Sequence, residues 1–491
     1  MKISSKPLLC AQIAAMILLA ACDDAAETET ATLDPSLAPA ALGTRHLHVS
    51  NARLRDELDR EVILRGFNAG GRAKMPPFLP FDEDASVDDA AEADAYFARI
   101  AALGANLVRL TFSWEGLEPE RGTYSQPYLD QYAQMLDAAY ANGLSVIVDF
   151  HQDVFASPFC GDGFPLWAIG DEIAHGPPRY DCGFPDWALP ALDATSDVSR
   201  AFDRLWSNTD GLQDDMEAMW RRVAAEYADH PAVAGFEVIN EPGAGSVPIE
   251  VFESETLPRL YERMGSAIHE VASGVPVFGG GRTGDSLGTS NHLAAPDLPG
   301  FVYAPHFYDP AASLGGRSLN AALLSTRIGT MLEPAQRWGV PAILGEFGSQ
   351  NSYPYKAEHF DIIYDALDAH LASGAMWDAS QTSNYWNSED FSVLRSDRSE
   401  QPWAFTTDRA YPRAVAGHIV RFSWSAETAT FELAVDNATA GVSEIHLPAR
   451  HLGDAPTIRL SGDARYRLMR ERSLLLVAAT PGQNYSLTVS R

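Results

Sequence analysis

Residues 234–242 read AGFEVINEP, a short apolar run that ends in the polar tripeptide Asn240-Glu241-Pro242. A run of this kind is typical of a strand in a parallel sheet whose two faces are both buried. Similar runs recur along the chain from about residue 45, and amphipathic helical stretches lie between them. This alternation predicts a parallel α/β architecture.

Eight such strands are expected, and eight βα units over roughly 340 residues predict a (β/α)8 TIM barrel with insertions. The candidate strands are Val62–Asn68, Asn106–Phe112, Leu144–Phe150, Ala234–Asn240, Pro276–Gly280, Phe301–Tyr308, Pro341–Phe347 and Ala375–Asp378. The candidate helices are Glu92–Leu103, Tyr128–Asn142, Asp214–His230, Phe252–Ala272 and Leu319–Trp338. No recognisable helix separates the fifth strand from the sixth.

The segments around the barrel differ from it in composition. After residue 410 short alternating segments appear, such as Thr428–Val435 and Ser443–Leu447, which predict a small antiparallel β-sandwich. Residues 22–44 are polar and acidic and are expected to form a flexible tether. The expected organisation is therefore a signal peptide over residues 1–21, a tether over 22–44, a catalytic barrel over 45–408 and a β-sandwich over 409–491.

The N-terminus is typical of an export signal. Lys2 and Lys6 precede the nearly apolar run Ala11–Ala21, which is too short to span a bilayer as a mature helix. The run ends in Leu19-Ala20-Ala21-Cys22, which resembles the bacterial lipobox, whose cysteine carries lipid. We expect a lipoprotein anchored through Cys22 in the periplasm or at the cell surface. An ordinary cleaved signal with an incidental cysteine is the alternative.

Charge and cysteine content narrow the functional classes further. The formal net charge of −30 would repel phosphate backbones, so we expect no nucleic-acid partner. Cys160 and Cys182 lie in one loop-like stretch of an exported chain, where a disulfide is permissible, with a metal site as the weaker alternative. No glycine-rich phosphate-binding motif follows a strand. We expect a monomer with no metal and no cofactor.

Polar residues gather just after the predicted strands, at the end where TIM barrels place their active sites. Glu241 follows the fourth strand and Glu346 ends the seventh, so the two side chains can face each other across the barrel mouth. Glycoside hydrolysis needs two carboxyl groups, one protonated and one ionised. A single glutamate at a strand end is often only a solvated residue, but two at opposite positions predict a glycosidase.

The ordered set of polar residues resembles glycoside hydrolase family 5, a retaining family of clan A. The set comprises Arg109, His151, Asn240-Glu241-Pro242, His306-x-Tyr308, Glu346 and Trp377. Further features resemble the endoglycoceramidase branch of that family, as does the C-terminal sandwich. These are Gly66-Phe67-Asn68 with Lys74, His151-Gln152-Asp153, Phe164-Pro165-Leu166-Trp167 and Tyr385-Trp386-Asn387. The repeated element Cys182-Gly183-Phe184-Pro185-Asp186-Trp187 has no clear counterpart in the branch.

The resemblance implies a role for each of these residues. Glu241 would be the acid/base and Glu346 the nucleophile, whose ionised form Tyr308 and Arg109 would favour. Asn240 would bond the sugar 2-hydroxyl, and Trp377 would form the floor under the sugar. The remaining residues expected to bind substrate are Lys74, His151, Asp153, Trp167 and His306.

The branch-level resemblance also implies a glycosphingolipid substrate, cut between glycan and ceramide. The insertion after the third strand carries Phe155, Phe159, Phe164, Trp167, Phe184 and Trp187, which we expect to form an apolar rim for the lipid. These aromatic residues could instead pack the insertion against the barrel. Other readings are a family 5 β-glucosidase or endo-β-glycanase and a non-catalytic glycan-binding lipoprotein. A metal-dependent hydrolase is disfavoured because Val62–Asn68 contains no histidine.

Overall fold

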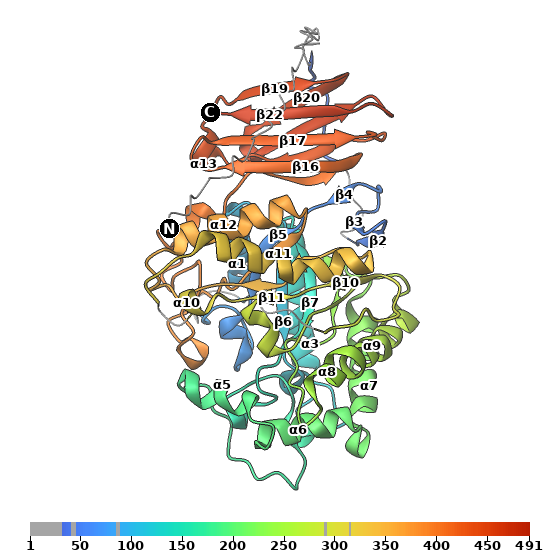
Figure 1. The fold of residues 1–491 in the computed structure, drawn as a ribbon, viewed down its shortest axis with the longest axis vertical. Helices are drawn as coiled ribbons and strands as arrows, with labels where there is room; N and C mark the ends of the chain where they lie inside the picture. Colours follow the sequence, from blue (N-terminus) through green and yellow to red (C-terminus); the bar gives the residue numbers. More distant parts are fainter. Residues whose placement is uncertain (1–31, 41–45, 85–88, 289–291, 314–315) are drawn as a thin grey trace, which may run out of the picture.

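The computed structural model of the protein describes residues 32–40, 46–84, 89–288, 292–313 and 316–491. The expected signal peptide and the expected lipidation site Cys22 lie outside these residues. Figure 1 shows two bodies stacked along the longest axis, with the C-terminal strands at one end and helices α5 (Phe184–Leu192) and α6 (Asp197–Trp206) at the other. The larger body is the barrel.

The barrel consists of one eight-stranded parallel sheet whose strands follow one another in chain order. Its strands are β5 (Arg65–Ala69), β6 (Leu107–Phe112), β7 (Ser145–Phe150), β8 (Val233–Glu237), β9 (Val277–Gly279), β10 (Phe301–Tyr303), β12 (Ile343–Leu344) and β14 (Ser373–Met376). A parallel bridge between Tyr303 and Ala342 closes the ring. Past that bridge β11 (His306–Phe307) pairs with β13 (Glu346–Phe347). The predicted TIM barrel is confirmed.

Helices surround the barrel, and the longer ones bury an apolar face against it. The surrounding helices are α1 (Asp89–Ala102), α2 (Trp114–Leu117), α3 (Gln126–Ala141), α7 (Leu212–Tyr227), α8 (Ile249–Val251), α9 (Leu257–Val271), α10 (Pro310–Ser313), α11 (Ala321–Trp338) and α12 (Lys356–Ala369). Side-chain caps mark several starts, as where Ser125 accepts a bond from the Tyr128 N–H. Between β9 and β10 the described residues form only the short 3-10 helix η5 (Thr283–Leu287), as the sequence had indicated.

The smaller body is a β-sandwich of two sheets. One sheet has the order β16-β17-β22-β19 and the other β1-β20-β21-β18-β15-β4-β3-β2. The C-terminal strands are β15 (Tyr411–Val415), β16 (His418–Ser425), β17 (Thr430–Asp436), β18 (Ser443–His446), β19 (Thr457–Ser461), β20 (Ala464–Met469), β21 (Leu474–Ala479) and β22 (Tyr485–Ser490). Phe431, Leu433 and Leu475 belong to the apolar core that joins the sheets.

The N-terminal part of the chain departs from the prediction, because it completes the sandwich. Strands β2 (His48–Ser50), β3 (Arg53–Arg55) and β4 (Glu61–Val62) extend the second sheet through the pairing of β4 with β15. Val62, predicted to begin the first barrel strand, therefore belongs to the sandwich, and that barrel strand begins at Arg65. The boundary between the sandwich and the barrel is hard to see in the sequence here, because the strands of both bodies bury the same types of apolar residue.

The expected tether is also partly structured. Strand β1 (Thr32–Leu33) pairs in parallel with β20, and Leu37 is buried against Leu474 and Leu476. Burying Leu37 on the sandwich offsets the entropy of ordering this short segment. The flexible-tether prediction is wrong for residues 32–40, and residues 41–45 lie outside the description.

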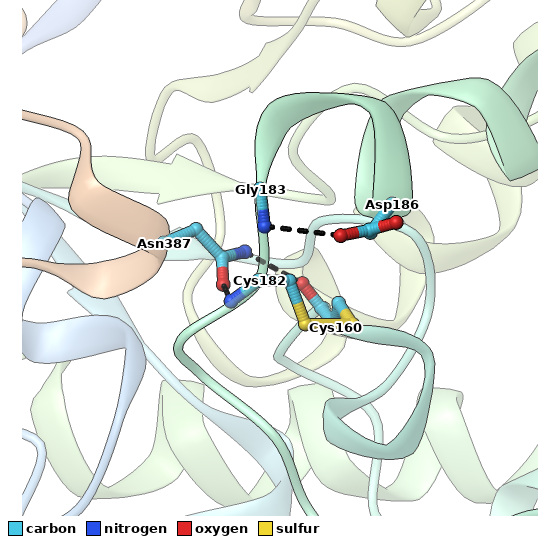
Figure 2. The surroundings of a disulfide bond; sticks show 5 residues. All are labelled: Cys160, Cys182, Gly183, Asp186 and Asn387. Carbon is cyan, nitrogen blue, oxygen red and sulfur yellow. Dashed lines mark hydrogen bonds between the residues drawn. A yellow bond between two sulfur atoms is a disulfide. The ribbon is translucent and has the colours of Figure 1, made fainter.

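The insertion after β7 forms the end of the molecule farthest from the sandwich. It contains α4 (Leu166–Ile169), α5 and α6, and the predicted disulfide joins Cys160 to Cys182, with Cα atoms 5.9 Å apart. Figure 2 shows Asn387 beside this bond. The Cys182 N–H donates to Asn387 Oδ1, and Asn387 Nδ2 donates to the Cys160 carbonyl, at 2.8 Å each. The insertion is thus attached to the loop after β14.

Across the described ranges, no helix combines the length and the apolar character that crossing a membrane requires.

Candidate active site

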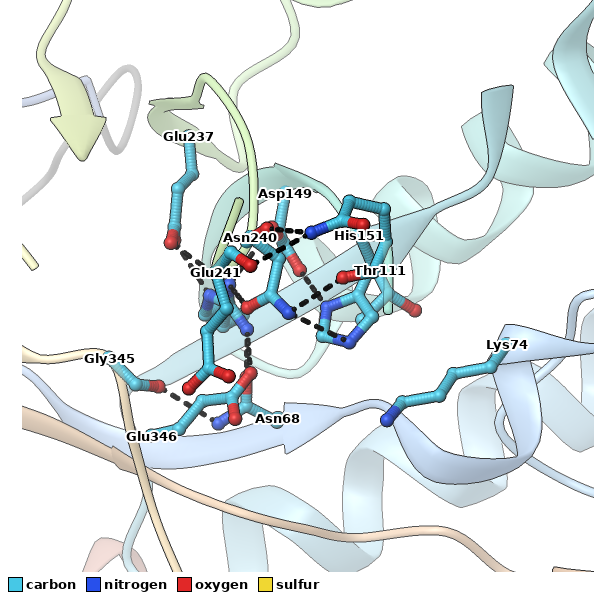
Figure 3. Close-up of polar contacts among 12 residues, drawn as sticks. Asn68, Lys74, Thr111, Asp149, His151, Glu237, Asn240, Glu241, Gly345 and Glu346 are labelled. Carbon is cyan, nitrogen blue, oxygen red and sulfur yellow. Dashed lines mark hydrogen bonds and ion pairs between the residues drawn. The ribbon is translucent and has the colours of Figure 1, made fainter. Parts of the chain in front are cut away.

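The two predicted carboxyl groups meet at the C-terminal mouth of the barrel (Figure 3). Glu241 lies in the turn after β8, and Glu346 is the first residue of β13. A carboxylate oxygen of each lies within 4.8 Å of the other and of a ring nitrogen of His306. His306 Nδ1 is 3.0 Å from Glu241 and 3.5 Å from Glu346. The separation of the two carboxyl groups is in the range of retaining glycosidases and far below the roughly 6.5–9.5 Å of inverting ones.

Positive charge surrounds Glu346. Arg109 Nη1 lies 2.7 Å from one oxygen, and the Tyr308 hydroxyl donates to the other at 2.8 Å. Burial by itself would raise the pKa of Glu346, but the charges of His306 and Arg109 outweigh it and hold that pKa below the ordinary value. Glu346 is therefore ionised where an ordinary glutamate would still be partly protonated, as a nucleophile requires.

Glu241 has the opposite environment. Burial raises its pKa above the ordinary value, the negative charge of Glu346 adds to the rise, and a hydrogen bond from His306 opposes it. Two glutamates a few ångströms apart thus have pKa values that move in opposite directions. This difference is the one expected for a general acid beside a nucleophile.

Arg109 is held in place by a set of buried acceptors at the barrel centre. Its guanidinium contacts Glu237 on β8 at 2.6 and 2.9 Å and Asp149 on β7 at 2.9 Å. It also donates to Asn68 and Asn240. Glu237 and Asp149 were not predicted as site residues from the sequence. The available signal was a charged residue inside each of two otherwise apolar strand runs, because such a charge must find a partner.

His151 and Trp377 form one wall of the site. Their rings stack with centroids 5.2 Å apart, and both residues are buried. Asp149 accepts from His151 Nδ1 at 2.8 Å, and Asp153 lies 3.5 Å from Nε2. The neighbouring carboxylates raise the pKa of His151 to about 10 although burial opposes the change. The ring is therefore an imidazolium near neutral pH.

Lys74 is a buried residue of this wall rather than an ordinary surface lysine. Its Nζ lies 2.6 Å from Asp153 and 3.3 Å from Glu389. It also lies 4.4 Å from the Trp377 ring and 4.1 Å from the Trp386 ring. Glu389, which also accepts from the Trp377 indole N–H, was missed, although it lies two residues after the motif Tyr385-Trp386-Asn387.

The aromatic residues of the insertion do not all form the expected rim. Phe155 and Phe164 are fully buried and stack on each other, so they pack the insertion against the barrel. The Trp167 indole N–H donates to the Glu118 carbonyl, and its ring packs on Trp114. None of the contacts found for Trp167 joins it to the carboxylate pair, so its role in substrate binding stays a prediction. Phe184 on α5 is 52% exposed.

Within the part of the chain that the structure describes, two groups of side chains could each offer three ligand atoms to a cation. They are Glu241 with His306 and Glu346, and His151 with Asp153 and Asp162. In each group a side-chain cation already lies at hydrogen-bond distance, Arg109 at Glu346 and Lys74 at Asp153. The positive charge that a metal would bring is supplied by the protein itself.

The barrel and the carboxylate pair at its mouth define a glycosidase with the geometry of the retaining class. A sequence model described as cellulase (glycosyl hydrolase family 5) matches residues 73–383, and one described as the glycoside hydrolase family 5 C-terminal domain matches residues 409–489. The chain belongs to glycoside hydrolase family 5.

Several proteins similar to this chain are named endoglycoceramidases, a narrower class than the family. An endoglycoceramidase of Cyanea nozakii is 26% identical over 413 residues, which are 78% of this chain and 79% of the relative. The solved endo-glycoceramidase II from Rhodococcus sp. in complex with ganglioside GM3 is 27% identical, with a TM-score of 0.75 over 90% of this chain and 99% of its own. The same protein solved as a lactosyl-enzyme intermediate has a TM-score of 0.74 at 27% identity, over 89% of this chain and 99% of its own.

Proposed function

We propose that the protein hydrolyses glycosphingolipids at the β-glycosidic bond between the glycan and ceramide. The observation that carries this proposal is the likeness to endoglycoceramidases over both the barrel and the sandwich, one of them solved with a ganglioside. A general family 5 β-glucosidase or endo-β-glycanase is the alternative, and it would use the same pair of carboxyl groups.

The geometry supports a double displacement. Ionised Glu346 attacks the anomeric carbon, while protonated Glu241 gives its proton to the departing ceramide oxygen. A glycosyl ester on Glu346 results. Glu241, now ionised, takes a proton from water, whose oxygen attacks the same carbon. The Glu346 carboxylate leaves, and the glycan keeps its β configuration.

The surroundings of the pair suit the two halves of such a substrate. His151, Asp153 and Lys74 offer charged groups to sugar hydroxyls beside the Trp377 ring. Helix α5 exposes Phe184, Leu189 and Leu192, of which Leu192 is 70% exposed. Exposed apolar side chains on one short helix near the barrel mouth favour contact with lipid.

The experiment compares glycosylceramides with cello-oligosaccharides as substrates of the purified enzyme and identifies the products by mass. We expect intact glycan plus ceramide, and a rise in kcat/KM with acyl length, since each buried methylene contributes about 0.8 kcal/mol. Glu346→Gln is the matched inactive control. Release of single sugar units from a substrate with a longer glycan would indicate an exo-acting β-glycosidase such as a β-glucosidase. Hydrolysis of cello-oligosaccharides without action on glycosylceramides would overturn the proposal while leaving the glycosidase class intact.

We also propose that the enzyme is exported and held at a membrane by lipid on Cys22. The support is the sequence of residues 1–22 alone. Several acyl chains would anchor it stably, whereas one chain binds only marginally. Cys22→Ser should release the protein to the soluble fraction or block its processing. A wild-type protein that is fully soluble after export would contradict this proposal.

A further inference from the structure

The backbone of Glu241 has an unusual conformation. Its φ is +31°, a region that residues with a side chain rarely adopt. Such a conformation persists only where the surroundings hold it, and the direction of the Glu241 side chain depends on it. The groups that hold this peptide therefore decide where the carboxyl group points.

Two side chains from different elements bond the Glu241 carbonyl. Gln152, in the loop after β7, donates from Nε2 to the carbonyls of Glu241 at 3.0 Å and Asn240 at 2.6 Å. Thr283, the first residue of η5, donates its hydroxyl to the Glu241 carbonyl at 2.9 Å. The Glu241 carbonyl oxygen thus accepts two hydrogen bonds, as many as it has lone pairs.

Each donor is itself held in one orientation. Gln152 is fully buried, and its Oε1 accepts from the Phe155 N–H at 2.9 Å, which turns its amide nitrogen toward the two carbonyls. The Thr283 carbonyl accepts from the Ser286 hydroxyl at 2.7 Å. Arg282, beside Thr283, is fixed by Glu253 at 2.8 Å.

Helix η5 is also linked to Glu346, through Tyr308. The Tyr308 N–H donates to the Ser286 carbonyl at 2.6 Å, and the Tyr308 hydroxyl bonds Glu346. One short element therefore bonds the backbone of Glu241 and the backbone of the residue that bonds Glu346.

We propose that Gln152 and Thr283 are positioning residues that aim the Glu241 carboxyl group at the leaving-group oxygen. They act through Glu241, so the inference rests on the acid role proposed for that residue. Loss of either donor lets the strained turn relax and moves the acid away from the oxygen that it must protonate. Misplacement of this kind slows proton donation more than it weakens substrate binding.

The test compares leaving groups in Thr283→Val, Gln152→Met and Glu241→Ala. Aryl β-glycosides would run from dinitrophenyl to phenyl, whose phenol has a pKa of about 10. A good leaving group needs no acid. We expect kcat/KM of the two positioning variants to fall by less than about threefold with the dinitrophenyl glycoside and by about tenfold or more with the phenyl glycoside. Thr283→Ser, which keeps the hydroxyl, should restore wild-type behaviour.

The matched control is Thr406→Val, which removes a buried hydroxyl that donates to the Trp403 carbonyl far from the pair. It should leave the leaving-group dependence unchanged. An equal loss with every leaving group in both positioning variants, or no rescue by Thr283→Ser, would overturn the inference. Glu241→Ala separates the two proposals. If kcat/KM depends steeply on the leaving group in Glu241→Ala but not in the two positioning variants, only the positioning role is refuted. If kcat/KM of Glu241→Ala does not depend on the leaving group, the acid role is refuted and the inference with it.

Discussion

At the scale of single residues, the same amino acid acquires opposite properties a few ångströms apart. Glu346 gains Arg109 and Tyr308 as partners, while Glu241 has one hydrogen bond from His306 and the negative charge of Glu346 nearby. The difference in environment, and not in chemistry, assigns the ionised form to one and the protonated form to the other.

Glu346→Gln tests the nucleophile. The amide can form no glycosyl ester, so kcat/KM should fall by at least about a thousandfold while substrate still binds. Turnover of a dinitrophenyl glycoside would measure the fall in kcat/KM, and calorimetry would measure substrate binding. The products of the wild-type enzyme should keep the β configuration, as seen by NMR early in the reaction. An inverted product would refute the mechanism.

The pH profile follows from the directions of the two pKa shifts. Activity rises as Glu346 loses its proton, at a pKa below the ordinary 4.5, and falls as Glu241 loses its proton, at a pKa above 4.5. We expect a bell-shaped profile of kcat/KM whose alkaline limb belongs to Glu241. The wild type should show that limb with the phenyl glycoside, and with the dinitrophenyl glycoside, which needs no acid, the wild type and Glu241→Gln should both lack it and keep the acid limb. An unchanged alkaline limb would contradict the assignment.

At the scale of elements, short segments far apart in sequence build the wall beside the pair. The 3-10 helix η1 (Gly71–Lys74) brings Lys74 to the 3-10 helix η6 (Trp386–Ser388) and the neighbouring Glu389. Lys74 is 4% exposed, so its ammonium meets the two carboxylates inside the protein, where water screens their attraction little.

Lys74→Met should leave Glu389 without its cation and Asp153 with His151 as its remaining positive partner. Breaking a buried ion pair in this way costs about 3–5 kcal/mol of stability, and KM should rise as the wall loosens. Urea unfolding and steady-state kinetics would measure the two effects. The double variant Lys74→Met/Glu389→Gln removes the unpaired charge and should recover part of the stability. No loss in the single variant would show that the ion pairs are unimportant.

The disulfide holds the base of α5, and Trp187 of α5 packs on Trp386. Replacing Cys160 and Cys182 by serine should reduce the free energy of unfolding by roughly 3 kcal/mol in the chain-entropy model, for a sequence separation of 22 residues. Reductant should destabilise the wild type and not the double variant. Two reactive thiols in the oxidised wild-type protein, titrated under denaturing conditions, would contradict the pairing.

At the scale of the whole molecule, the sandwich is assembled from both ends of the chain. Arg60, which directly precedes β4, is 2% exposed and bonds Asp56 and Glu444 at 2.8 and 2.9 Å. The N-terminal hairpin and β18 are thereby joined across most of the sequence, with the barrel between them.

Arg60→Met should destabilise the protein by about 3–5 kcal/mol, because the buried carboxylate of Asp56 and the partly buried carboxylate of Glu444 lose their partner. Thermal unfolding would measure the loss, and kcat/KM of the folded enzyme should not change. The matched control is Arg465→Met, which removes an exposed ion pair with Asp34 on the same sandwich and should hardly alter Tm. Equal effects of the two variants would show that burial of the Arg60 network is irrelevant.

Local sequence was sufficient for most of the barrel strands, for the longer surrounding helices other than α12, and for the pair Glu241 and Glu346. Each of these depends on a short apolar period or on a residue type at the end of a strand, which neighbours along the chain reveal. The C-terminal sandwich was predicted in the same way, from the alternation of its strands. The disulfide was expected instead because both cysteines lie in one loop of an exported chain.

The tertiary structure alone decided which segments complete the sandwich and which charges balance one another. Nothing near Thr32 or Val62 shows that β1 and β4 pair with strands some 350 to 430 residues later, because register between distant strands depends on the surfaces that meet. Only the tertiary structure shows the roles of Asp149, Glu237 and Glu389. It also shows that Phe155 and Phe164 are buried. The reason is physical: a pKa shift or a buried contact is a property of the atoms that surround a side chain, and folding brings most of those atoms from elsewhere in the sequence.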